Sequence, residues 1–317
     1  MSKCLYCYKP LGAQEQDFHK ACSRKMFDRP DAPILPYTEA QMESLALQIV
    51  QSQITVTGVQ PKLSLSVAAG KEQQEPRKLT IVGMWGHYIL KPPSLHYPQL
   101  PEVEDLTMHL ASLAKIPVVP HSLIRMQSGN LAYITRRIDR SSTGMLHMED
   151  MCQITNRLTE HKYRGSHEQI AKAIQQYSAT PGLDLVNFFE LVLFSFLTGN
   201  ADMHLKNFSL IQRSGNDFVL SPAYDLVSTA LVNPADTEDL ALSLNGKKNK
   251  ITRKDFTHVL TSMDLDPKQQ ENIFKKMEHA GAKWRVCIQE SFLSASYKQV
   301  YTELLRTRFA RLEMKGI

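Results

Sequence analysis

The sequence lacks the marks of a membrane-spanning, secreted or repetitive protein. No stretch approaches the roughly 18 uninterrupted apolar residues of a membrane span, and the first residues contain no apolar core of signal-peptide length. Only 5 of the 317 residues are cysteine, too few for a disulfide-stapled scaffold. Neither an internal repeat nor a low-complexity tract occurs. We therefore expect a globular protein of the cytoplasm, without membrane contact.

An excess of charge of one sign is also missing. The formal net charge is +5, and the basic residues are scattered along the chain. One small cluster, Lys247-Lys248-Asn249-Lys250, is typical of a solvated loop rather than of a nucleic-acid surface. We expect no direct nucleic-acid binding. A length of 317 residues with 43% hydrophobic content is sufficient for two lobes of ordinary domain size.

The hydrophobic periodicity changes from strand-like to helical near residue 140. Strands are expected at residues 54–57, 62–67, 78–82, 87–91, 118–126 and 131–136, the last two as a hairpin. A short strand is expected at 208–211, and helices at 39–51, 102–115, 167–177, 184–198, 253–261, 267–280, 282–294 and 297–313. The pattern predicts an α+β fold with a small β-rich N lobe (31–140) and a larger α-helical C lobe (141–317), preceded by a Cys/His segment (1–30). Protein kinases are built as a small β lobe followed by a helical lobe.

The phosphate-binding motifs GxGxxG and Walker A are absent. Segment 55–62 nevertheless lies between two expected strands and contains Gly58, which permits positive φ and close approach of the backbone to a ligand. A plain hairpin turn is the alternative. We predict a loop that covers the ATP phosphates, with contacts from Thr57, Gly58, Val59, Gln60 and Lys62.

The loop at 199–207, between an apolar helix and a short strand, carries most of the functional signal. Asp202 and Asn207 stand five positions apart, as do the base and a metal ligand in the catalytic loop of protein kinases. Asp225 follows at a strand end and is the expected second Mg²⁺ ligand. Lys206 is a candidate for neutralising the γ-phosphate charge. His204 is either catalytic or a packed core residue.

Lys91 ends the expected strand 87–91, where its ammonium can contact phosphate oxygens as a point charge. An edge-strand lysine that prevents aggregation is the alternative. Glu104 is the expected partner of Lys91; Glu102 and Asp105 compete for that role, because acids are favoured in a first helical turn. The backbone that reads adenine is expected after the last N-lobe strand, at Arg136, Arg137, Ile138 and Asp139.

Three cysteines and a histidine crowd the first residues. Cys4 and Cys7 form a CxxC pair, and His19 and Cys22 follow as HxxC. Three thiolates and an imidazole give closed tetrahedral coordination, so the spacing favours a structural Zn²⁺ site. Incidental cysteines are the alternative. The remaining Cys152 and Cys287 are expected to be ordinary buried thiols.

Taken in order, these motifs resemble the HipA-like serine/threonine kinases, the toxin components of bacterial toxin–antitoxin systems. The resemblance covers roughly residues 50–310. It is carried by Gly58-Val59-Gln60-Pro61-Lys62, Tyr88-Ile89-Leu90-Lys91-Pro92-Pro93, Glu104, Arg137-Ile138-Asp139-Arg140, Glu149-Asp150-Met151-Cys152-Gln153, the segment from Asp202 to Ser209, and Tyr224-Asp225-Leu226.

The resemblance implies an ATP- and Mg²⁺-dependent kinase that phosphorylates a protein of translation, such as an aminoacyl-tRNA synthetase, and its own Gly58 loop. In the family this loop carries serine as the acceptor, whereas here Thr55 and Thr57 are the available hydroxyls. A catalytically silent kinase-fold protein that acts by binding a partner or DNA complex, and a small-molecule kinase, are the alternative functions.

Full-length HipA-like toxins carry a further N-terminal subdomain before this loop. The chain therefore resembles HipT, the short toxin of three-component HipBST systems. That similarity implies two partners: a separate small antitoxin resembling the subdomain, and a DNA-binding antitoxin from the same operon. We expect the small antitoxin to dock on the β lobe, roughly residues 40–140, at an exposed sheet edge or apolar surface.

Overall fold

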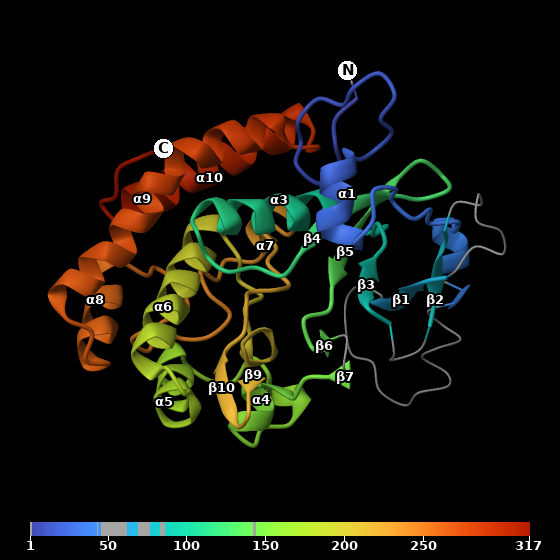
Figure 1. Ribbon diagram of the computed structural model, residues 1–317. Coiled ribbons are helices and arrows are strands. Elements are labelled where there is room, and N and C mark those ends of the chain that lie inside the picture. Colours follow the sequence, from blue (N-terminus) through green and yellow to red (C-terminus); the bar gives the residue numbers. More distant parts are fainter. Residues whose placement is uncertain (1, 43, 46–61, 69–76, 83–85, 142–143) are drawn as a thin grey trace. The chain divides into compact units, whose positions relative to one another are not determined.

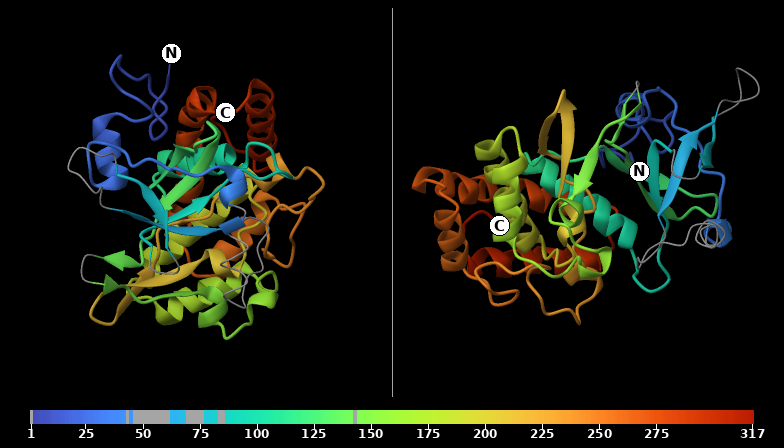
Figure 2. Two further views of the ribbon diagram at one scale, coloured as in Figure 1. Left: turned by 90° about the vertical axis from the view of Figure 1, so that its right-hand side faces the viewer. Right: turned by 90° about the horizontal axis from the view of Figure 1, so that it is seen from below.

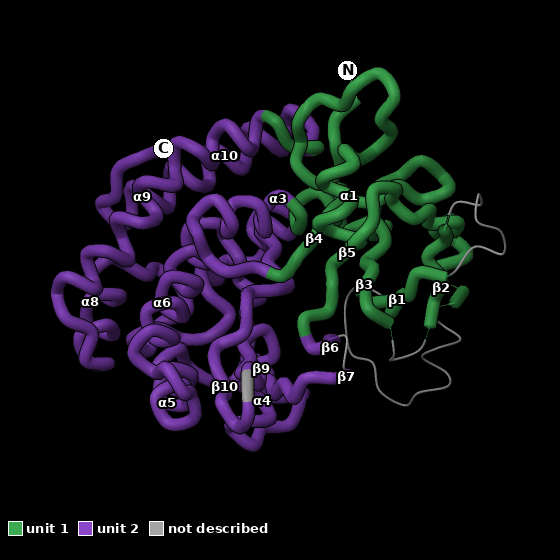
Figure 3. Tube along the Cα trace, in the orientation of Figure 1, with its two compact units in different colours: residues 1–105, 119–138, 290–292 green, residues 106–118, 139–289, 293–317 purple. Residues whose placement is uncertain are grey.

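The computed structural model describes residues 2–42, 44–45, 62–68, 77–82, 86–141 and 144–317. The chain divides into two compact units (Figure 3): unit 1 comprises residues 1–105, 119–138 and 290–292, and unit 2 comprises 106–118, 139–289 and 293–317. The end of the expected helix 39–51, the expected strand 54–57 and five predicted site residues lie outside the described residues. These five are Thr55, Thr57, Gly58, Val59 and Gln60.

Unit 1 is organised around a five-stranded antiparallel sheet with the order β2-β1-β3-β5-β4 (Figure 1). Its strands are β1 (Leu63–Val67), β2 (Leu79–Ile81), β3 (Tyr88–Lys91), β4 (His121–Arg125) and β5 (Leu131–Arg136). Successive side chains of a strand point to opposite faces of the sheet, so residues two positions apart lie on the same face. Leu63 and Leu65 are buried on β1, and Leu90 is buried on β3. The sheet confirms the strands expected at 62–67, 78–82, 87–91 and 131–136.

Both edges of this sheet are covered by the N-terminal part of the chain. At the β2 edge, Ile34 forms a parallel bridge with Lys78. At the β4 edge, the Leu123 amide donates to the Leu5 carbonyl over 3.3 Å. The expected docking of a small antitoxin on the β lobe, at an exposed sheet edge or apolar surface, stays a prediction. Helix α1 (Lys20–Phe27) contributes Met26 and Phe27 to the same hydrophobic core.

Helix α3 (Leu100–Leu113) connects β3 to β4 and confirms the helix expected at 102–115. The boundary between the units falls within this helix, after Asp105. The acidic residues Glu102, Glu104 and Asp105 therefore all belong to unit 1. Another boundary between the units falls between Ile138 and Asp139, within the segment whose backbone is predicted to read adenine.

Unit 2 is mainly helical. Its longer helices are α5 (His167–Tyr177), α6 (Pro181–Thr198), α8 (Arg253–Ser262), α9 (Pro267–Glu290) and α10 (Ala295–Arg311). Short helical segments are α4 (Met151–Ile154), α7 (Thr229–Val232), η1 (Thr159–His161) and η2 (Leu205–Asn207). Helices α5 and α6 lie side by side (Figure 1, Figure 2). The predicted mixed α+β class, with a sheet-rich region and a larger helical part, is confirmed.

Helix α6 is the central helix of unit 2. Pro181 occupies its first turn, where a missing N–H costs nothing, and Gly199 ends it in the left-handed region at φ 67°. With 18 residues and a mean hydropathy of 1.4, α6 meets the length and composition of a membrane span, but 72% of it is buried inside the structure. Its apolar surface is thus accounted for by packing within unit 2.

Two small sheets complete unit 2. Strands β8 (Met148–Asp150), β9 (Ser209–Ser214) and β10 (Asp217–Leu220) form a three-stranded sheet in the order β10-β9-β8, and β6 (Arg140–Ser141) pairs with β7 (Gly144–Met145). Strand β9 confirms the short strand expected at 208–211. The sequence pattern did not indicate β8 or β10, since three- and four-residue strands carry too little periodicity.

The C-terminal helices correct one sequence prediction. Residues 267–280 and 282–294 were expected to form two helices separated at Gly281, but α9 runs without a break to Glu290. A Cβ atom on Gly281 would lie 2.3 Å from the Gly316 carbonyl oxygen. Gly281 is therefore required for close packing of the C-terminal segment on α9, and not for a chain break.

Candidate active site

In unit 1, Lys91 and Glu104 form a buried ion pair. The Lys91 Nζ lies 2.5 Å from Glu104 Oε1, and the two side chains are 6% and 2% exposed. Lys91 sits at the end of β3 opposite Tyr133 of β5, whose ring its ammonium faces at 5.5 Å. Of the three acids considered for this role, the structure selects Glu104. The ion pair fixes the Lys91 ammonium at the end of β3, where it is buried from solvent.

The two competing acids are used differently. Asp105 is fully buried and receives a hydrogen bond from the Tyr8 hydroxyl over 2.6 Å. Its other carboxylate oxygen lies 2.8 Å from His121 Nδ1. Burial raises the pKa of Glu102 above its ordinary value. Asp105 thus ties the N-terminal segment and β4 to the beginning of α3, next to Glu104.

In unit 2, the loop after α6 brings Asp202 and Asn207 together. The side-chain Nδ2 of Asn207 donates to the backbone carbonyl of Asp202 over 3.0 Å. The Asp202 amide donates to Asn200 Oδ1 over 3.1 Å, which folds the loop on itself. The Tyr163 hydroxyl donates to Asp202 Oδ1 over 2.5 Å. The loop therefore presents a half-buried carboxylate that accepts a hydrogen bond from Tyr163, on a backbone that two further hydrogen bonds hold in place.

Lys206 extends from the same loop towards β8. Its Nζ lies 2.6 Å from Asp150 Oδ2. Asp150 is also the N-cap of α4, where it forms a capping box with Gln153. The Tyr224 hydroxyl donates to the Lys206 carbonyl over 3.0 Å, which connects the loop to the segment that carries Asp225.

Asp225 lies two residues after Ala223, whose amide donates to the Pro117 carbonyl over 2.8 Å. Its φ of 61° places Asp225 in the left-handed region. This conformation is uncommon for a residue with a Cβ, although Asp tolerates it better than most, and it is found disproportionately at functional sites. The strained backbone gives a second reason, besides spacing, to single out this carboxylate.

His204 is a buried residue of the loop, and its ring meets Tyr163 edge-on at 5.0 Å between centroids. Burial lowers the pKa of His204, so the ring is held neutral. A neutral ring packed between loop and aromatic side chain fits the packing interpretation of His204. The His204 amide donates to the Asp202 carbonyl over 2.8 Å, but among the described residues its ring forms no hydrogen bond with Asp202 or Lys206.

The remaining predicted nucleotide contacts are spread over both units. Arg136 forms an ion pair with Asp28, and the Arg137 amide donates to the His87 carbonyl over 2.8 Å. Ile138 ends unit 1, and Asp139 of unit 2 contacts Arg140 over 2.7 Å. Lys62, just before β1, is exposed.

The four predicted zinc ligands lie together in unit 1. The ligand atoms of Cys4, Cys7, His19 and Cys22 are all within 4.8 Å of one another. None of the five cysteines of the chain forms a disulfide. Burial raises the pKa of Cys22, and the neighbouring Cys4 adds to the rise.

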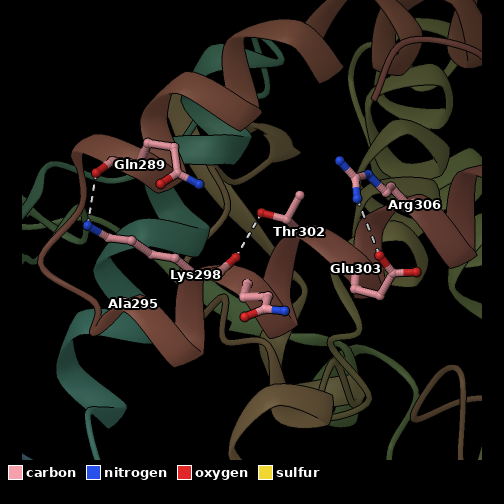
Figure 4. A pocket seen from close by; sticks show the side chains of 7 residues that line it. Gln289, Ala295, Lys298, Thr302, Glu303 and Arg306 are labelled. Carbon is pink, nitrogen blue, oxygen red and sulfur yellow. Dashed lines mark hydrogen bonds and ion pairs between the residues drawn. The ribbon is translucent and has the colours of Figure 1, made fainter.

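A surface hollow along α10 contains none of the predicted site residues. It is lined by Gln289, Ala295, Lys298, Gln299, Thr302, Glu303 and Arg306 (Figure 4). Its polar groups are already engaged locally, as in the 2.9 Å bond from Lys298 Nζ to the Gln289 carbonyl. We therefore do not assign the catalytic site to this hollow.

Two functional candidates were not predicted from the sequence as members of the site. Tyr163 contacts Asp202 from 39 positions away, and Asp150 contacts Lys206 from 56 positions away. Asp150 belongs to a segment that carries the family resemblance, and the Asp150-x-x-Gln153 spacing is that of a capping box, but neither signal indicated a contact with Lys206. Nothing in the sequence around Tyr163 indicates its role.

Comparison with known proteins decides the family. A family model described as the HipA-like C-terminal domain matches residues 54–284. The chain belongs to this family. Among curated proteins, "Putative kinase Y4dM" of Sinorhizobium fredii is 32% identical over 229 residues, which cover 68% of this chain and 54% of that protein. A "Putative kinase" of Haemophilus influenzae is 28% identical over 249 residues, with 73% and 69% covered. The match thus spans about half of Y4dM.

Solved structures show the same fold. HipA of Shewanella oneidensis, solved with HipB and its operator DNA, has a TM-score of 0.69 at 21% identity and matches over 88% of this chain and 73% of that chain. The Helicobacter pylori proinflammatory kinase CtkA has a TM-score of 0.54 at 17% identity, with 71% and 87% covered. At these identities the likeness concerns the fold alone, which is the predicted kinase-like, HipA-like fold.

Proposed function

We propose that this protein is an ATP- and Mg²⁺-dependent serine/threonine protein kinase. The observation that carries the proposal is the loop after α6. The Asn207 side-chain nitrogen donates to the backbone carbonyl of Asp202, which leaves the side-chain oxygen of Asn207 available to bind a metal ion. Carboxylate and amide oxygens are the donors that Mg²⁺ prefers, so Asn207 and Asp225 fit this ion.

Each further residue has a role that its contacts support. Lys91, oriented by Glu104, would bind phosphate oxygens of the nucleotide. When bound, Mg²⁺ would neutralise charge on the transferred phosphoryl group. Asp202 would accept the proton of the acceptor hydroxyl, in a position that the Tyr163 hydroxyl now occupies. Lys206, held by Asp150, would stabilise negative charge beside that carboxylate.

We further propose a toxin role in the cytoplasm, with a protein of translation as substrate and autophosphorylation at Thr55 or Thr57. Support comes from the family membership and from the solved HipA neighbour, which was determined with HipB and operator DNA. A DNA-binding antitoxin is therefore the first partner to seek. The likeness to HipT is supported by the sequence resemblance alone. The same holds for the proposal that a separate small antitoxin binds this chain.

The competing functions differ in their acceptor. A catalytically silent protein would transfer no phosphate. The presence of Lys91, Asp202, Asn207 and Asp225 in this chain argues against that function. A small-molecule kinase would leave proteins unlabelled, and fold alone does not exclude it.

One experiment separates these functions. The purified chain is incubated with Mg²⁺ and γ-labelled ATP, alone and with a bacterial lysate, and label is measured in protein and in small-molecule fractions. Label on this chain or on a discrete lysate protein supports the protein kinase. Label only in small molecules would support the small-molecule kinase, and no label above that of the Asp225→Ala variant would support the silent protein.

A further inference from the structure

The N-terminal cysteines and histidine of unit 1 have the geometry of a metal site. His19 Nδ1 lies 3.4 Å from Cys7 Sγ and 3.7 Å from Cys22 Sγ. Zinc bonds of about 2.3 Å to sulfur and about 2.0 Å to nitrogen place neighbouring atoms of a tetrahedral centre about 3.5 Å apart. The measured separations agree with this edge length, and Cys4 Sγ completes the set within 4.8 Å.

The second nitrogen of His19 provides an independent observation. His19 Nε2 lies 3.0 Å from the Pro10 carbonyl oxygen. A carbonyl can only accept, so this nitrogen carries the proton and Nδ1 keeps its lone pair towards the two thiols. A ligating histidine almost always donates its other N–H to a carbonyl or carboxylate, which fixes the ring for the metal. Here the same hydrogen bond orients His19 towards Cys7 and Cys22.

The backbone around the CxxC pair is folded into a tight turn. The Cys4 amide donates to the Lys9 carbonyl, and the Tyr8 amide donates to the Cys4 carbonyl, each over 2.9 Å. Tyr8, directly after Cys7, adopts a left-handed φ of 64°. This conformation is unfavourable for a bulky residue and persists only when the surroundings enforce it.

Tyr8 connects this turn to the catalytic half of unit 1. Its buried hydroxyl donates to Asp105 Oδ2 over 2.6 Å. Asp105 is the neighbour of Glu104, and Glu104 holds Lys91. A group that fixes the turn at Cys7 therefore also fixes the first half of α3.

We propose that Cys4, Cys7, His19 and Cys22 bind a structural zinc ion, which fixes Tyr8 on Asp105 and thereby the first half of α3. The zinc site stands by itself. Its consequence for Lys91 and Glu104 matters for catalysis only if the proposed kinase function holds.

The direct test is metal analysis of the full chain, purified without a polyhistidine tag. We expect about one zinc ion per chain. Replacement by Co²⁺ should give the visible absorption of a tetrahedral thiolate site. The variants Cys7→Ser and Cys22→Ser should lose zinc at least tenfold, whereas the matched control Cys287→Ala should retain it. Wild-type protein with no zinc, with iron instead, or with a disulfide among these cysteines would overturn the proposal, as would full zinc retention in Cys7→Ser.

The connection to α3 is tested separately from activity. Zinc is removed from the wild-type chain with a chelator, and amide hydrogen exchange is followed across residues 100–105. We expect faster exchange there after removal, with recovery when zinc is returned and no response in Cys7→Ser. Unchanged exchange at 100–105 would overturn the connection. Because neither readout uses ATP, an inactive kinase would leave both results interpretable.

Discussion

The substitution Glu104→Gln tests the buried ion pair most sharply. Both partners are nearly inaccessible to water, and their charged atoms are 2.5 Å apart. Removing one partner of a buried ion pair typically costs about 3–5 kcal/mol, and here the buried Lys91 ammonium would lose the charge of Glu104. Glutamine keeps the shape and one accepting oxygen, so we expect the lower end, about 3 kcal/mol.

The double variant Lys91→Met/Glu104→Gln separates stability from catalysis. Replacing both members of a buried pair is often neutral, so the double variant should regain most of the lost stability. The double variant should nevertheless lose phosphoryl transfer, because the Lys91 ammonium is gone. Stability is measured by urea unfolding, and transfer with labelled ATP. Glu303→Gln, which breaks the exposed pair with Arg306, is the matched control and should unfold like wild type.

Two results would refute this reasoning. If Glu104→Gln unfolds at the wild-type urea concentration, the pair is not buried in solution. If the double variant transfers phosphate at the wild-type rate, Lys91 does not bind the nucleotide.

The remaining predictions concern metal binding, autophosphorylation and pH. Asp225→Ala should reduce phosphoryl transfer by on the order of 10³-fold or more while its circular dichroism and unfolding midpoint stay close to wild type; near-normal turnover would remove Asp225 from the metal site. Mass spectrometry after incubation with Mg-ATP should find phosphate on Thr55 or Thr57, and an active enzyme labelled only elsewhere would contradict this. Burial lowers the pKa of His167 to about 3, so as pH falls below about 6.5 the unfolded chain binds a proton that the folded chain does not. Stability should therefore fall by up to about 1.4 kcal/mol per pH unit between these values, and His167→Phe should remove this part of the slope in urea melts, whereas an unchanged slope would show that another group is responsible.

The elements with strong periodicity could be predicted from the sequence. Helix α5 was expected at 167–177 and has these bounds, because its apolar positions repeat at helical spacing and Ser166 caps it. The loop at 199–207 was predictable for a different reason: Asp202 and Asn207 stand five positions apart, which is a pattern that the local sequence alone reveals. Glu104 was the expected partner of Lys91, but Glu102 and Asp105 remained as competitors. Tertiary packing decided among them.

What could not be predicted depends on distant contacts. The pairs Tyr163–Asp202 and Lys206–Asp150 join residues far apart in the chain, and no local pattern specifies them. Gly281 was interpreted as a helix break because glycine is a poor helix former. Its actual role, room for the Gly316 carbonyl, exists only in the folded chain. The contacts of Leu5 and Ile34 with the two edges of the unit 1 sheet likewise join distant parts of the chain and could not be predicted from local sequence.

The central claim is that Asp202 supports transfer of phosphate from ATP to a protein hydroxyl. The most direct measurement compares the initial rate of label transfer from γ-labelled ATP to protein for purified wild type and Asp202→Asn, after both are shown to be folded. The account predicts transfer by wild type and a loss on the order of 10³-fold or more in the variant. Equal rates, or a folded wild type that binds Mg-ATP and labels no protein, would contradict it.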